Sequence, residues 1–227
     1  MVISTLLVLK WLHILAMVYW LGGEWGVFQT SYNVINRDLS MDERRRHMET
    51  AYRIDILART GIIMLLPLGL HMGYYWGVQP FGGMFIPLMW IAFLTWTSLT
   101  WAAFIFRETD RGLMLTKVDE AIRYFVIPAL MIASIASLLG YGPFEAGSMQ
   151  KWFSTKIFLY SLMLVIGLKL RFVMREWTEL FRILAVDGPN AEVEATLEKS
   201  LKNARLMAYV YWIGIGSIGF IGAVKPF

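Results

Sequence analysis

The sequence predicts an all-α integral membrane protein, a six-helix transmembrane bundle. Three observations predict this class. The 227 residues are 57% hydrophobic, long uncharged runs separate the charged residues, and only 17% of the chain is charged, whereas a soluble domain carries about 25%. The absence of cysteine excludes disulfides, cysteine-ligated iron–sulfur clusters and covalently attached haem. The net charge of +4 follows membrane topology, so no nucleic-acid partner is expected.

Six apolar runs are each close to the ~20 residues that cross ~30 Å of hydrocarbon. They make one membrane domain of residues 1–227, with the lipid bilayer as its main partner. The predicted spans are residues 3–27, 56–78, 83–106, 123–141, 152–172 and 206–224.

The charges between the spans predict how the chain is oriented. Three alternate connections, with the span ends beside them, carry six, four and seven Lys or Arg residues, and the opposite side carries only Lys151 and Lys225. Basic loops stay in the cytoplasm. Both termini are therefore predicted to face outward, into the periplasm, across a bacterial cytoplasmic (inner) membrane.

Helix signals outside the spans predict helices longer than the membrane is thick. The first helix is expected to run on to about Ile35, and Ser40 with Glu43 forms a capping-box start for the second. Spans 1 and 2 thus form a long helical hairpin. A cytoplasmic helical segment follows at 174–205, either an interfacial helix or an extension of span 5, and Asn190 begins the last helix.

A polar stripe marks the first span. Lys10, His13, Met17, Trp20 and Glu24 recur at three- and four-residue steps, so they share one helix face. An ionisable residue at membrane depth is costly and normally faces protein, a cofactor or water. This face is therefore predicted to point into the bundle.

Two of the three histidines, His13 and His71, lie inside apolar spans. Neutral imidazoles on neighbouring helices can bind a haem iron from both sides, so both are candidate axial ligands. Lys10, Met17 and Trp20 are candidates for the same site. The alternative for each histidine is a hydrogen bond to a neighbouring helix, and spacing does not decide whether both bind one haem.

Glu24 and Arg59 lie at comparable depth at the cytoplasmic ends of spans 1 and 2. The sequence predicts that they form an ion pair that closes the hairpin. The alternative is that Glu24 is a proton-relay or quinone-site carboxylate. Lys10 either extends toward the membrane surface or faces a haem propionate.

The first span also carries a family resemblance. Leu9 to Ala16 reads LKWLHILA and Trp20 to Gly23 reads WLGG, while 53–76 contains LGLH. These segments resemble a loose group of bacterial membrane proteins that includes HemJ-type protoporphyrinogen oxidases, copper-resistance D-type proteins and the membrane part of a cytochrome-linked urate oxidase. The resemblance covers about the first 80 residues and implies that His13 ligates haem with Lys10 nearby.

Together these observations predict a protein that binds haem b non-covalently and transfers electrons, between a quinone and an outer-side partner, within a larger membrane complex. It would be an oxidoreductase subunit rather than an enzyme with a recognisable catalytic set. Two other hypotheses remain open. One is an accessory subunit without redox chemistry, and the other is a copper or small-solute permease of the copper-resistance D type.

Overall fold

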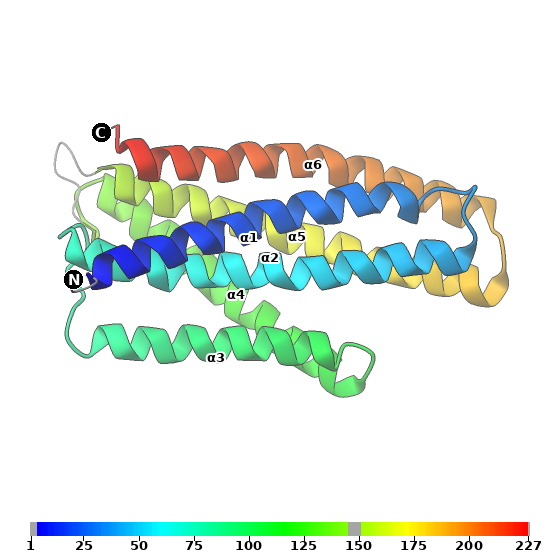
Figure 1. Cartoon of the computed structure of the whole chain (residues 1–227), viewed down its shortest axis with the longest axis horizontal. Helices are drawn as coiled ribbons and strands as arrows, with labels where there is room; N and C mark the ends of the chain where they lie inside the picture. Colours follow the sequence, from blue (N-terminus) through cyan, green and yellow to red (C-terminus); the bar gives the residue numbers. More distant parts are fainter. Residues whose placement is uncertain (1–3, 145–150, 227) are drawn as a thin grey trace.

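The structure, a computed structural model, describes residues 4–144 and 151–226. Within these ranges the chain is all-helical, and its helices run lengthwise along an elongated bundle (Figure 1). The helices are α1 (Thr5–Val34), α2 (Met41–Tyr75), α3 (Phe85–Ile105), α4 (Asp110–Leu138), α5 (Lys151–Asp187) and α6 (Ala191–Val224). All six are long and apolar enough to cross a membrane, which confirms a multi-pass membrane protein.

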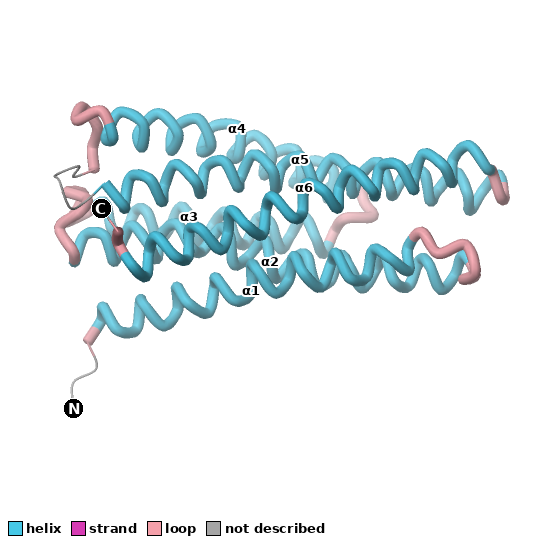
Figure 2. Tube along the Cα trace, turned by 90° about the horizontal axis from the view of Figure 1, so that it is seen from above, coloured by secondary structure: helices cyan, strands magenta, loops and turns pink. Residues whose placement is uncertain are grey.

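The two ends of the bundle differ. The start of α1, the end of α6, the α2–α3 connection, the end of α4 and the start of α5 lie at one end, here called the terminal end, at the left of Figure 1. The α1–α2 and α5–α6 connections lie at the opposite end, here called the basic end, and Figure 2 shows the same grouping from a second direction. The predicted order and alternation of the six spans are thus confirmed.

Local signals define where the long helices begin. Ser40 caps α2: its Oγ accepts a hydrogen bond from the Glu43 N–H at 3.3 Å, and the Glu43 carboxylate accepts one from the Ser40 N–H at 2.9 Å. Asn190 caps α6 by accepting from the backbone N–H groups of Glu192 and Val193. Both caps were predicted, because capping depends on residues only two or three positions apart.

Helices α4 and α5 extend beyond the spans that the sequence predicted. The segment 174–205 is divided between a continuation of α5 and the start of α6, so the extension of span 5 is confirmed. Helix α4 begins at Asp110, well before the predicted span at 123, and Thr109 caps it by accepting from the Gly112 N–H. Charged residues make these turns too polar for a span but are no obstacle to a helix.

Helix α2 is the centre of the bundle. In its most apolar window 67% of the residues are buried, against 17% to 39% in the other five helices. Helix α3 packs on α2 and α4 alone among the described elements, and it forms one margin of the bundle in Figure 1. Helix α2 is therefore the helix most enclosed by the rest of the bundle.

The α1–α2 hairpin is closely packed because small residues meet along it. A Cβ added at Gly61 would lie 2.5 Å from the Ala16 carbonyl oxygen and 2.9 Å from the Trp20 backbone nitrogen. Backbones approach this closely only where side chains are minimal. Gly22 on the same hairpin differs, because a Cβ there would meet nothing within 4 Å.

Gly61→Ala is expected to lower stability by about 1–3 kcal/mol, because the methyl group forces the two backbones apart. Gly22→Ala is the matched control and should be neutral or slightly stabilising, since alanine is the better helix former. Thermal unfolding midpoints of the two variants in detergent check this. Equal midpoints would show that the hairpin is packed more loosely than described.

Candidate functional site

A cavity of about 270 Å³ lies between α1, α2, α5 and α6 toward the terminal end. We call it the terminal cavity. Its walls are mostly apolar and aromatic, and α2, its C-cap residue and α5 contribute Leu65, Leu66, Trp76, Trp152, Phe153 and Ile157. Large apolar cavities with a few polar groups are where proteins hold small molecules and cofactors.

His13 is a polar residue in the lining of the terminal cavity. It projects from α1 into the terminal cavity and lies against Gly69 of α2, where an added Cβ would be 3.3 Å from the imidazole Cε1. Its Nδ1 is buried and has no hydrogen-bond partner among the described residues. A buried polar atom without a partner costs about 1–3 kcal/mol, and the imidazole to which it belongs lines the cavity, so the ring is a candidate ligand for a bound group.

Two lysines also line the terminal cavity. Lys10 lies one turn before His13, and Lys156 comes from α5 on the other side. The Lys156 ammonium occupies the space that a side chain at Gly222 of α6 would fill. Met17, one turn after His13, lines the cavity as well. The predicted grouping of Lys10, His13 and Met17 is therefore present, with Lys156 as a member that the sequence did not indicate.

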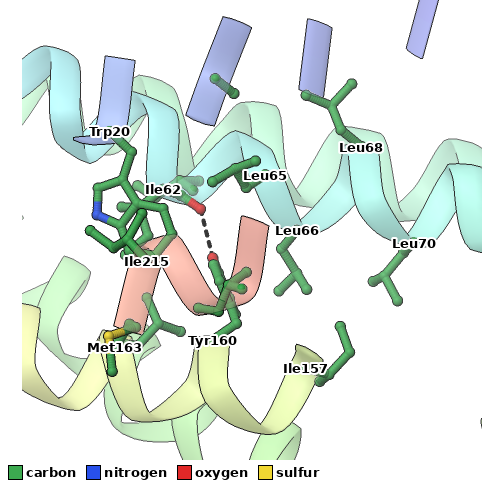
Figure 3. Close-up of a cluster of buried hydrophobic side chains, with 14 of the residues drawn as sticks. Trp20, Ile62, Leu65, Leu66, Leu68, Leu70, Ile157, Tyr160, Met163 and Ile215 are labelled. Atoms are coloured by element: carbon green, nitrogen blue, oxygen red, sulfur yellow. Dashed lines mark hydrogen bonds between the residues drawn. The ribbon is translucent and has the colours of Figure 1, made fainter. Parts of the chain in front are cut away.

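Trp20 does not line the terminal cavity, although the sequence placed it in the site. It is fully buried, and its indole N–H donates to the Tyr211 hydroxyl at 3.0 Å. It contacts the Tyr160 and Tyr211 rings edge to face. The Tyr160 hydroxyl donates to the Ile62 carbonyl at 2.6 Å, the dashed line in Figure 3. We call these three rings the aromatic layer; it closes the core beneath the cavity.

His71 lies elsewhere. Its Nδ1 accepts a hydrogen bond from the Trp90 indole at 3.1 Å, and its ring stacks on Tyr75. Because it follows Gly69 by two residues, it points to nearly the opposite side of α2, toward α3 and away from the terminal cavity. The structure thus does not bring His13 and His71 together as a pair of axial ligands.

A second cavity, of about 80 Å³, lies nearer the basic end, and we call it the basic cavity. Glu24 and Arg59 both line it, but the predicted ion pair between them is not formed. Arg59 pairs instead with Asp55, one turn earlier on α2. Four-residue spacing on one helix satisfies the guanidinium locally, and this competing partner was visible in the sequence.

Beside the basic cavity lies a buried ionic cluster that sequence reasoning missed. Asp119 of α4 is fully buried. Its carboxylate accepts hydrogen bonds from the Trp96 indole at 2.7 Å and the Thr100 hydroxyl at 3.0 Å, both on α3. It also binds Arg123 of α4 at 3.1 Å and Arg171 of α5. The spacings Trp96/Thr100 and Asp119/Arg123 are the only sequence signal of this cluster.

Comparisons of the chain with protein-family models, with curated proteins and with solved structures found no match.

Asp119→Asn is expected to destabilise the bundle by about 3–5 kcal/mol, because Arg123 would keep a buried charge without a carboxylate and Arg171 would keep only its contact with Glu120 at 3.5 Å. The matched control is Glu179→Gln, which removes an exposed carboxylate paired with Arg182 on α5 and should leave the unfolding midpoint unchanged. Denaturation followed by circular dichroism measures both. Similar midpoints for the two variants would mean that the cluster does not hold α3, α4 and α5 together.

Proposed function

We propose that this protein binds a b-type haem in the terminal cavity, with His13 as an axial ligand of the iron, and takes part in membrane electron transfer. The observation that carries the proposal is the His13 imidazole, which lines a large apolar cavity and whose Nδ1 has no hydrogen-bond partner among the described residues. Neutral imidazole is the usual protein ligand of haem iron.

The terminal cavity has the chemistry that such a group requires. Its volume of about 270 Å³ exceeds that of a ~150 Å³ cavity able to hold a benzene ring. Exposed residues of α1 and α6, Ile14, Val18 and Ala223, also line it, so the space opens sideways between these helices. A flat macrocycle larger than the enclosed volume can therefore extend toward the lipid.

The two lysines support the same proposal. Haem carries two propionates, and an apolar cavity offers nothing else to balance them. Lys10 and Lys156 approach from α1 and α5 and line the cavity with His13. In a medium of low dielectric, ammonium–carboxylate pairs are stronger than in water. We infer that these lysines orient the macrocycle by its propionates.

A haem held in this way supplies one-electron chemistry. The chain's own residues fix its position: His13 holds the iron, and Leu65, Leu66 and Phe153 keep water from one side. The aromatic layer closes the cavity toward the basic end. We propose that a quinone and an outer-side protein partner exchange the electrons, so that the chain acts as one subunit of a larger redox complex.

We also propose that the basic end faces the cytoplasm of a bacterial inner membrane, with both termini outside. The distribution of Lys and Arg residues supports this orientation. The terminal cavity then lies in the outer half of the bilayer, where an outer-side partner can approach it.

The protein purified from haem-replete cells is expected to show a Soret band and sharp reduced α and β bands. His13→Ala should abolish these bands, because the iron loses its protein ligand. His71→Ala is the matched control and should retain them, since His71 bonds to Trp90 outside the terminal cavity. Optical spectra and haem content per chain provide the measurement.

Loss of the spectrum in His71→Ala with retention in His13→Ala would contradict the assignment of the ligand. A colourless wild-type protein that keeps its helical content would contradict haem binding altogether. In that case His13 serves a structural role in an accessory subunit.

The orientation predicts the behaviour of reporter fusions in a bacterial host. Alkaline phosphatase, which is active only outside the cytoplasm, should be active when fused after Phe227 and inactive when inserted at Gly188 between α5 and α6. The opposite pattern would reverse the orientation and leave the six helices unchanged.

A further inference from the structure

Arg205 of α6 is a partly buried cation that the proposed function does not use. Its guanidinium lies over the Tyr32 ring of α1, with Cζ 3.6 Å from the ring centroid. Its Nε and Nη2 are both buried, and neither has a hydrogen-bond partner among the described residues. Arginine is always charged and carries five N–H donors, so a guanidinium in this state requires an anion.

The carboxylates near Arg205 have other partners. Glu194 and Glu198, earlier on α6, pair with Arg44 and Arg37 of the α1–α2 hairpin. Glu24 precedes Tyr32 by eight residues on α1, which places it about 12 Å further along the helix. No side chain of the described structure therefore supplies the counter-charge for Arg205.

The arginines that line the basic cavity, except Arg205, form ion pairs with described carboxylates. Four arginines line it, against the two carboxylates of Glu24 and Asp55. Asp55 pairs with Arg59, and Asp119, beside the cavity, serves Arg123 and Arg171 together. Glu120 also pairs with Arg171, so Arg205 is the arginine of this cavity that forms no ion pair with a described residue, and an anion is drawn to the wall that it occupies.

Aromatic side chains show where this wall meets the membrane surface. Trp25, Tyr32 and Tyr209 are exposed on α1 and α6, and Trp25 packs on Trp212 with ring centroids 4.5 Å apart. Tryptophan and tyrosine collect at the level of lipid headgroups. Arg205 immediately precedes the apolar part of α6, so its guanidinium lies at the depth of lipid phosphates.

We propose that Arg205 binds the phosphate group of an anionic phospholipid in the seam between α1 and α6. Two N–H groups of a guanidinium match two phosphate oxygens in bidentate geometry. The apolar residues Val27 and Ala208, which line the same cavity, offer a surface for the start of an acyl chain. This site is separate from His13 and does not depend on haem.

The test uses the full chain, purified in mild detergent and examined by native mass spectrometry. Wild type is expected to retain one phospholipid, and added phosphatidylglycerol should raise its thermal midpoint. Arg205→Leu should bind phosphatidylglycerol about ten- to a hundredfold more weakly, the value of a hydrogen-bonded charge contact. Arg182→Leu, which removes an exposed arginine of α5, should bind as wild type does.

Arg205→Lys tests the geometry, because lysine keeps the positive charge but lacks the two parallel N–H donors of a guanidinium. We expect its affinity for phosphatidylglycerol to lie between those of wild type and Arg205→Leu. Circular dichroism of each variant verifies that it is folded. Equal retention of lipid by wild type and folded Arg205→Leu overturns the proposal. Protection of wild type by inorganic phosphate at the same ionic strength, without any effect of phosphatidylglycerol, overturns the assignment to a lipid.

Discussion

The structure depends on one constraint: polar groups within a bilayer have no water to bind, so they must face protein. Helix α1 shows this most clearly. Lys10, His13 and Glu24 line the two cavities, while Trp11 and Leu15 on its other side are exposed. The constraint decides how α1 is rotated against α2, and Gly61 then allows the two backbones to meet. The function is therefore expected in the two cavities that this polar face borders.

The aromatic layer divides the interior into two chemically different parts. Toward the terminal end the walls are apolar, and the polar groups are an imidazole and two amines. Toward the basic end, arginines and carboxylates from α2, α4 and α5 surround the smaller cavity, and Asp119 connects α3 to them. Low dielectric in the first part favours cofactor binding, and the ionic cluster in the second fastens the outlying helix α3.

Features that depend on near neighbours in the chain were predictable from the sequence. Apolar runs gave the six helices, and the caps at Ser40 and Asn190 required only two or three adjacent residues. The stripe from Lys10 to Met17 was predictable because helical period alone places these residues on one face. The cavity that they line required the structure, since α5 and α6 provide half of its walls.

Tertiary partners were not predictable in the same way. Trp20 was expected to contact the cofactor, but its indole N–H donates a hydrogen bond in the core to the hydroxyl of Tyr211, a residue far along the chain. Arg59 had two candidate ion-pair partners, Asp55 on its own helix and Glu24 on α1. Asp55, which is nearer in the sequence, forms the pair. Asp119 could be counted only as a loop charge until Trp96, Thr100 and Arg171 were seen around it. His71 follows Gly69 by two residues, which turns it to the other side of α2, where it contacts Trp90 of α3.

The central claim is that the imidazole of His13 faces the terminal cavity in order to hold haem iron. An experimental density map of the protein purified from haem-replete cells tests it most directly. The account predicts a flat disc of density in the terminal cavity, in contact with His13 and with its edge between α1 and α6. Protein density alone in that cavity, or a disc beside His71 against α3, would contradict it.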